Sequence, residues 1–97
     1  MVEIRRTEAF RVWVNGLADV RAKARIFARI DRMRLGNPGD VKPVGDGVCE
    51  MRIDHGPGYR VYFVQHGNVA VVLLCGGTKG SQAEDIEAAK ALAKDLE

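Results

Sequence analysis

Four polar side chains near the middle of the chain alternate along two neighbouring predicted strands. Glu50 and Arg52 precede a His-Gly-Pro-Gly turn, and Arg60 and Tyr62 follow it. Residues on one face of adjacent antiparallel strands come within roughly 5–8 Å of each other, so we expect these four to share one exposed patch. A guanidinium offers a planar fork of donors to phosphate, a phenol ring can stack on a base, and a carboxylate can accept a proton. The patch fits a phosphodiester, and equally a plain cross-strand salt bridge of Glu50 with Arg60 beside a Tyr62 that covers the sheet.

The stretch CGGTKGSQ, residues 75–82, places Lys79 between a strand and the start of a helix. Free N–H groups at a helix N-terminus, together with a nearby lysine, attract phosphate. The stretch is not a nucleoside-triphosphate loop, because Thr78 stands where that motif has glycine and Gly80 stands where it has Ser or Thr. It is therefore either a second phosphate contact or a strand-to-helix turn with an exposed lysine.

Four arginines recur at spacings of four, four and three along a predicted helix, which places them on one face. They are Arg21, Arg25, Arg29 and Arg32. Residues 1–35 carry nine Arg/Lys against four Asp/Glu, a net +5, whereas residues 81–97 carry two against five, a net −3. A basic first third favours an anionic partner approached from one side. The arginine face is either simply solvated or a surface that contacts a nucleic-acid backbone.

Histidines and cysteines give no metal-ligand spacing, so we expect neither a metal nor a cofactor. His55 and His66 lie in different turns; His55 is at the hairpin tip near the patch, where it could reach a substrate. Cys49 and Cys75 lie in apolar strand-like runs without a CxxC motif. We expect them to be reduced core residues, which is typical of a cytoplasmic protein.

Length and periodicity predict one α+β domain over residues 1–97, in the order β-α-α-β-β-β-α. The predicted elements are a strand at 2–6, a helix from the cap Thr7 to about Gly16, a helix from the cap Asp19 to about Leu35, strands at 48–54, 59–65 and 69–75, and a final helix opened by a capping box at Ser81–Glu84. Residues 36–47, rich in Gly and Pro, read as a loop. We expect one antiparallel meander with helices on a face. No apolar run approaches the roughly 18 residues of a membrane span.

Three sequence blocks in combination resemble the RelE/ParE superfamily of bacterial toxins, and within it the HigB-like branch of addiction-module killer proteins. The blocks are LGNPGDVKPVGDGV, GPGYRVYF and GGTKGSQ. The similarity extends from about Phe10 to Leu92. It implies the family fold, in which paired N-terminal helices and a C-terminal helix pack on an antiparallel sheet, and this agrees with the predicted order.

The resemblance also implies an activity. Members of the RelE branch enter the ribosomal A site and cut mRNA, by attack of a ribose 2′-hydroxyl on the adjacent phosphate and without a metal. Carried over residue by residue, the catalytic cations are Arg52, Arg60 and Lys79. The arginines of the helix 19–35 would then contact RNA, and the resemblance implies a cognate antitoxin, often a helix-turn-helix DNA-binding protein, as partner.

Two departures from the family pattern concern proton transfer. Glu50 stands where well-studied members have a lysine, and neither tyrosine nor histidine follows Lys79. Glu50, His55 and Tyr62 are the candidates for moving protons. Two other hypotheses remain open: a ParE-like inhibitor that binds DNA gyrase without catalysis, and a degenerate member that only binds its antitoxin.

Overall fold

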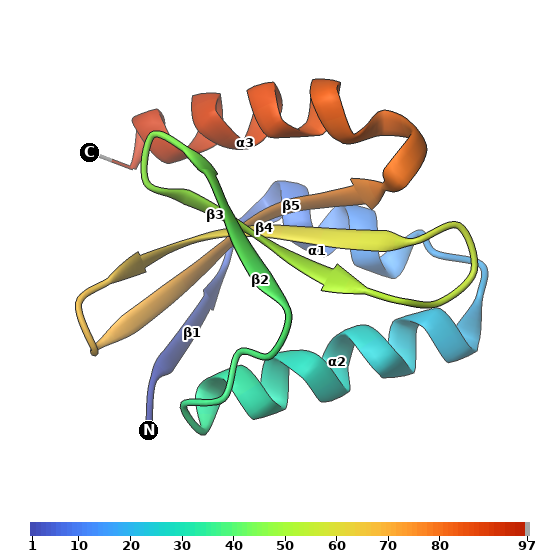
Figure 1. Cartoon of the computed structure of the whole chain (residues 1–97), viewed down its shortest axis with the longest axis horizontal. Coiled ribbons are helices and arrows are strands. Elements are labelled where there is room, and N and C mark those ends of the chain that lie inside the picture. The colour runs from blue at the N-terminus through green and yellow to red at the C-terminus, as the bar shows by residue number, and fades with distance from the viewer. Residues whose placement is uncertain (97) are drawn as a thin grey trace.

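The computed structural model describes residues 1–96 and shows a five-stranded sheet with helices on both faces (Figure 1). Its elements are β1 (Glu3–Arg6), α1 (Glu8–Asn15), α2 (Val20–Arg34), β2 (Val41–Gly45), β3 (Val48–Ile53), β4 (Tyr59–His66), β5 (Ala70–Thr78), the 3-10 helix η1 (Lys79–Ser81) and α3 (Gln82–Asp95). The α+β class is confirmed. The order is also confirmed, with one strand added.

The sheet has the order β1-β5-β4-β3-β2, and all neighbours are antiparallel except β1 and β5, which run parallel. The added strand is β2, which lies inside the segment predicted as a loop, so that prediction was wrong for residues 41–45. Lys42 pairs with Glu50 of β3. Pro43 is tolerated because β2 is an edge strand and no second neighbour needs its missing N–H.

Helices cover both faces of the sheet, whereas the sequence predicted helices on one. Figure 1 shows α2 and α3 on opposite sides of the strands. Phe10 of α1 and Ile26 of α2 are buried against one face, while Ala89 of α3 packs with Tyr62 and Leu74 on the other. Strand β5 is buried on both faces, as its continuous apolar run predicts.

Side-chain N-caps determine where α1 and α2 begin. The Thr7 side chain accepts the Phe10 N–H, and one Asp19 oxygen accepts the N–H groups of Arg21 and Ala22, so both predicted caps are confirmed. The capping box predicted at the last helix was wrong. Ser81 makes no cap bond to the helix backbone, because its hydroxyl donates to Asp85 at 2.5 Å.

Two glycines, Gly76 and Gly77, allow the end of β5 to pack closely between α1 and α3. A Cβ at Gly76 would lie 2.3 Å from the Trp13 ring of α1, and one at Gly77 would lie 1.8 Å from the Asp85 carboxylate of α3. Only glycine permits this approach on both faces. The turn that carries Lys79 therefore leaves the sheet from a fixed place.

The cysteines are free, and burial raises the pKa of both thiols, that of Cys75 to about 11. Cys49 packs with the α1/α2 layer and Cys75 with the α3 layer, so neither is an activated nucleophile. Within residues 1–96, no cluster of His, Cys, Asp and Glu side chains is arranged to hold a metal. None of the helices there is long and apolar enough to span a membrane.

Candidate functional site

Arg52, Arg60 and Lys79 line a single open pocket of about 290 Å³ at one end of the sheet. They come from β3, β4 and η1 respectively. The remaining wall is formed by residues of β3, of β4, of the turn between them and of the loop before β2: Asp40, Ile53, Asp54, Gly58 and Tyr59. The structure thus brings together the three cations that the sequence singled out.

Strand register accounts for this convergence. Arg52 and Arg60 are direct cross-strand partners, so their side chains leave the same face of the sheet at the same level. The Lys79 N–H donates to the Gly58 carbonyl oxygen at 2.8 Å, which ties η1 to the β3–β4 turn. Gly58 has a φ of 81°, a conformation that favours glycine.

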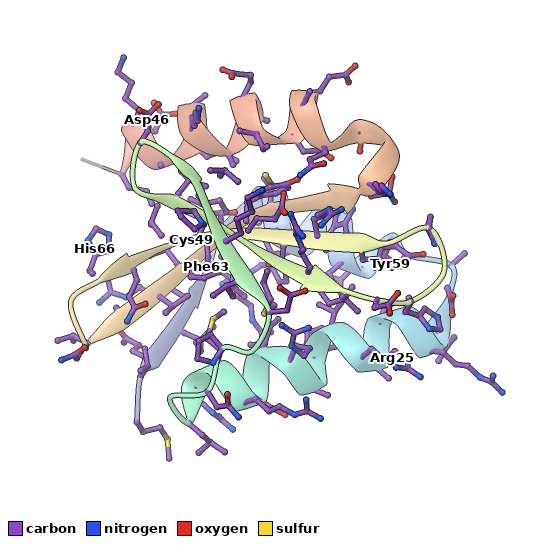
Figure 2. All side chains as sticks on the ribbon, viewed as in Figure 1. Arg25, Asp46, Cys49, Tyr59, Phe63 and His66 are labelled. Atoms are coloured by element: carbon purple, nitrogen blue, oxygen red, sulfur yellow. The ribbon has the colours of Figure 1, made fainter. Side chains whose placement is uncertain are left out.

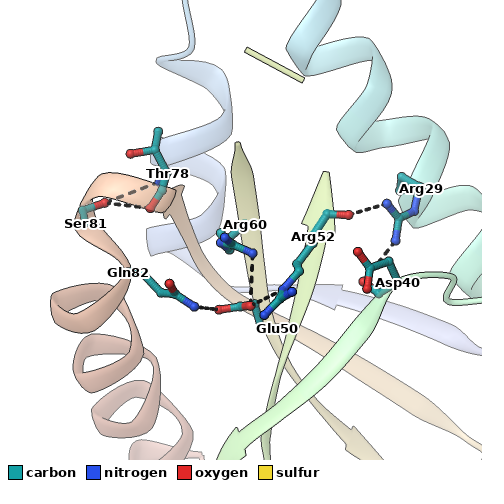
Figure 3. Close-up of polar contacts among 8 residues, drawn as sticks. All are labelled: Arg29, Asp40, Glu50, Arg52, Arg60, Thr78, Ser81 and Gln82. Carbon is teal, nitrogen blue, oxygen red and sulfur yellow. Dashed lines mark hydrogen bonds and ion pairs between the residues drawn. The ribbon is translucent and has the colours of Figure 1, made fainter. Parts of the chain in front are cut away.

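Glu50 lies beneath the two arginines and has no exposed surface. Its Oε1 accepts from Arg52 Nε at 2.9 Å and from Arg60 Nη1 at 3.2 Å, and its Oε2 accepts from Gln82 Nε2 at 2.7 Å (Figure 3). The prediction of an exposed Glu50 was wrong because α3 covers this face. The alternative interpretation, a salt bridge of Glu50 with Arg60, is what the structure shows.

The charge state of Glu50 follows from these contacts. Burial alone would raise the pKa of this carboxyl, but the hydrogen bonds from Arg52 and Gln82 and the charge of Arg60 outweigh burial and lower it. The hydrogen bond that Arg52 donates to Glu50 is also the first cause of a raised pKa at Arg52. Glu50 is therefore an ionised partner of the arginines at neutral pH, and a poor acceptor for a substrate proton.

Tyr62 was predicted to present its ring to a base, and this prediction was wrong as well. It has no exposed surface and packs under α3. Its hydroxyl has no hydrogen-bond partner within the described chain, and burial raises the pKa of that hydroxyl far above its usual value. The ring cannot stack on a nucleotide, nor the hydroxyl move a proton at neutral pH.

His55 is held away from the pocket wall. Its Nε2 lies 3.1 Å from Asp19 Oδ2 at the start of α2, and its ring stacks on Tyr59 with 6.5 Å between ring centroids. His66 lies at the other end of β4 from Tyr59 (Figure 2). Tyr59 itself lines the pocket, so His55 supports the site from behind one of its walls.

The arginine face of α2 divides into two kinds of residue. Arg21, Arg25 and Arg32 are exposed. Arg29 is half-buried and donates to the carbonyl oxygens of Arg52 at 2.5 Å and Asp40 at 3.4 Å (Figure 3). It also donates to the Pro38 carbonyl oxygen at 3.1 Å. Burial lowers the pKa of Arg29. The prediction that Arg29 is a free RNA-contacting side chain was wrong, because its donors hold β3 and the 38–40 segment together.

A second open pocket of about 260 Å³ adjoins the first. Arg25, Arg29 and Arg32 contribute to its wall, and Ile53 and Asp54 belong to both pockets. The exposed Arg25 and Arg32 are thus continuous with the cation pocket. This continuity was not visible in the sequence, since it depends on how α2 crosses the end of β3.

Sequence reasoning also missed Gln82 and Asp40. Gln82 had no distinguishing feature beyond its place three residues after Lys79. Asp40 enters the pocket because β2, which follows it, pairs with β3, and the sequence predicted β2 as part of a loop.

Comparison with known proteins settles the family. Residues 13–96 match the family described as Phage derived protein Gp49-like (DUF891). The chain belongs to this Gp49-like family. An uncharacterized protein of Haemophilus influenzae is 50% identical over 95 residues, which cover 98% of this chain and 96% of that protein.

The Gp49-like chain also resembles a solved structure. It matches a chain of the toxin-antitoxin complex RelBE2 of Mycobacterium tuberculosis with a TM-score of 0.52 and 21% sequence identity, over 80% of this chain and 98% of the other. This similarity shows that the fold is RelE-like.

Proposed function

We propose that this Gp49-like protein is the toxin of a bacterial type II toxin-antitoxin pair and acts as a ribosome-dependent mRNA endoribonuclease. The RelE-like fold and the RelBE2 similarity support the toxin assignment. The sequence blocks described above resemble the HigB-like branch. The observation that carries the nuclease is the convergence of Arg52, Arg60 and Lys79 on one open pocket.

Three cations from three segments suit a phosphodiester better than any single charge does. A guanidinium offers paired donors to phosphate oxygens. A lysine ammonium adds a mobile point charge where negative charge grows in the transition state. Arg52 and Arg60 are fixed on the sheet, whereas Lys79 is exposed at the pocket edge. The pocket therefore combines two fixed guanidinium groups with one ammonium group that can adjust its position.

In the proposed reaction the ribose 2′-oxygen bonds to phosphorus while the bond from phosphorus to the 5′-oxygen breaks. The products are a 2′,3′-cyclic phosphate and a 5′-hydroxyl. The 2′ proton must leave to an acceptor, and the pocket wall offers the carboxylates of Asp40 and Asp54. The leaving 5′-oxygen takes a proton from water or from the Lys79 ammonium. Glu50 and Tyr62 take no part in these transfers because both are buried.

The charges in the pocket are nearly balanced. Its three cations face two acids, Asp40 and Asp54, with ionised Glu50 beneath. Phosphate binding at this place therefore depends on donor geometry, and long-range attraction for RNA must come from elsewhere. Arg25 and Arg32 in the adjoining pocket supply it, together with the exposed Arg21 of the same helix. Each phosphate contact there adds to the salt dependence of binding.

The partners follow from this assignment. The ribosome and its mRNA are the targets, and an antitoxin of the helix-turn-helix, DNA-binding kind holds the toxin inactive in the cytoplasm. The competing function is a ParE-like gyrase inhibitor on the same fold, for which the cation pocket has no role. A degenerate, antitoxin-binding member would likewise not need it.

Induction of the protein in cells, with and without its antitoxin, separates these functions. We expect codon-phased cuts in mRNA, intact DNA and normal supercoiling, and we expect the cuts to disappear in Lys79→Ala. Intact messages with broken or relaxed DNA would refute the nuclease function and support the gyrase inhibitor. Unimpaired growth and intact messages would leave only antitoxin binding.

A further inference from the structure

We propose that Glu50 is the positioning residue of the site: its carboxylate fixes Arg52 and Arg60 at one place and connects them, through Gln82, to the segment that carries Lys79. This inference rests on the proposed function and adds to it how the cations are kept in register. Glu50 touches neither the pocket nor a substrate, since it does not line the cavity and is fully buried.

The arginine pair needs such a partner. Like charges directly opposite each other on adjacent strands repel, and Arg52 and Arg60 are direct partners. Their contacts with the same oxygen, Glu50 Oε1, at 2.9 and 3.2 Å replace that repulsion with two charge-assisted hydrogen bonds. Each guanidinium is thus anchored by Glu50, and both arginines also line the pocket.

Arg60 shows that this anchoring is incomplete within the protein. Its side chain is only 10% exposed, yet its Nε has no hydrogen-bond partner among residues 1–96. Buried donors are normally satisfied. Among these described residues its guanidinium makes one side-chain hydrogen bond, to Glu50, so its position depends on that carboxylate.

The second oxygen of Glu50 extends the connection to α3. Gln82 is the first residue of α3 and directly follows η1, where Lys79 begins. Its side-chain amide donates to Glu50 Oε2 at 2.7 Å. One carboxylate therefore links β3 and β4, which supply the two arginines, to the start of α3, which directly follows the η1 turn that carries Lys79.

The test is steady-state cleavage of mRNA on programmed ribosomes by Glu50→Gln, Gln82→Ala and the control Glu3→Gln. Glu3 is suitable because it makes the same kind of contact, to Arg5 Nε at 2.8 Å, but on the exposed edge strand β1. We expect Glu50→Gln to lower kcat about 10- to 100-fold, the scale of a misplaced catalytic group. KM should stay level or fall, because the variant adds positive charge. Gln82→Ala should lower kcat about 5-fold, the scale of one hydrogen bond, and Glu3→Gln should change nothing.

Two further readouts distinguish positioning from proton transfer. The pH profile of kcat should keep its shape in Glu50→Gln, and loss of its acidic limb would overturn the inference by making Glu50 a proton acceptor. In an Arg52→Ala background, Glu50→Gln should cost much less than in the wild type, because Glu50 acts through the arginines. Equal costs in both backgrounds, or unchanged kcat in both site variants, would also overturn it.

Nuclear magnetic resonance of the arginine Nε–H groups keeps the test valid when cleavage is absent or when Glu50→Gln does not fold. Inorganic phosphate is titrated into the wild type and into Gln82→Ala. We expect the Arg52 and Arg60 resonances of the wild type to shift together, and those of Gln82→Ala to broaden and respond less. Identical responses in the two proteins would overturn the positioning role. A wild type that binds phosphate in this way but cuts no RNA would overturn the proposed function alone.

Discussion

Lys79→Ala separates the chemistry of the site from the stability of the fold. The Lys79 side chain is exposed, and the contact that holds this turn, from the Lys79 N–H to the Gly58 oxygen at 2.8 Å, belongs to the backbone. Truncation leaves that contact in place, so we expect the free energy of unfolding to change by less than about 0.5 kcal/mol.

The loss in turnover should be much larger. Removal of one electrostatic donor from a developing phosphorane charge costs about 2–4 kcal/mol of transition-state stabilisation. At 25 °C this corresponds to a fall in kcat/KM of roughly 30- to 900-fold. The upper part of the range applies if Lys79 also protonates the leaving 5′-oxygen, because the variant then loses a donor of charge and of a proton together.

The assay is single-turnover cleavage of mRNA on programmed ribosomes, alongside urea unfolding of the free protein. Lys94→Ala is the matched control, since Lys94 is another exposed lysine, on α3, outside the cation pocket. It should cleave like the wild type. Lys79→Arg should recover part of the activity, because it restores the charge with a different reach.

Two results would refute this reasoning. If Lys79→Ala cleaves within about 3-fold of the wild type, Lys79 contributes no transition-state contact of the expected size. If Lys79→Ala and Lys94→Ala lose activity equally, the effect is one of net charge on ribosome binding, and the pocket is not where the phosphate reacts.

Three further changes probe the parts of the fold that hold the site. Tyr62→Phe removes a buried hydroxyl without a partner in the described chain, so the free energy of unfolding should stay level or rise by up to about 1–2 kcal/mol with cleavage retained; lost cleavage would contradict the buried placement. Gly76→Ala puts a Cβ 2.3 Å from the Trp13 ring and should cost at least about 2 kcal/mol in urea unfolding; an unchanged midpoint would contradict the close packing. Asp19→Asn removes a carboxylate whose pKa is lowered in the fold, first by a backbone N–H of the helix start and then by His55. Because the folded-state pKa lies below the unfolded one, this carboxylate stabilises the fold above about pH 4 and the contribution is lost as pH falls through the folded pKa. The Tm of the variant should therefore fall less than that of the wild type between about pH 5 and pH 2, and parallel curves would speak against it.

The sequence correctly predicted which side chains of β3 and β4 lie on the same face of the sheet. Alternation alone placed Glu50, Arg52, Arg60 and Tyr62 on one face, and the strand register confirms it. Side chains alternate between the two faces of a strand, so a strand can be placed in only two ways. The apolar Met51 and Val61 belong to the core under α1 and α2, and their polar neighbours must then lie on the opposite face.

The sequence did not predict that the opposite face is buried too. A polar residue at every second position normally indicates solvent, and the weakly amphipathic α3 gave no indication of which face it would cover. The misplacement of Glu50 and Tyr62 follows from this single error. The misplacement of Arg29 has a different origin, since the carbonyl groups that hold it belong to a loop and a strand end that no periodicity describes.

The buried charges themselves favour the nuclease over a pure binding module. The face that holds Glu50 is otherwise apolar, with Val48, Leu74 and Ala89 in its core. Placing a carboxylate and two guanidinium groups there costs desolvation that apolar residues of similar volume would avoid, so such a network is weakly justified by stability alone. The network holds Arg52 and Arg60 at fixed positions in the wall of the pocket that Lys79 also lines. A surface that only bound gyrase or an antitoxin could use flexible exposed arginines, which α2 already provides. Fixed cations matter where charge develops at one defined point, and phosphoryl transfer is the reaction that requires this.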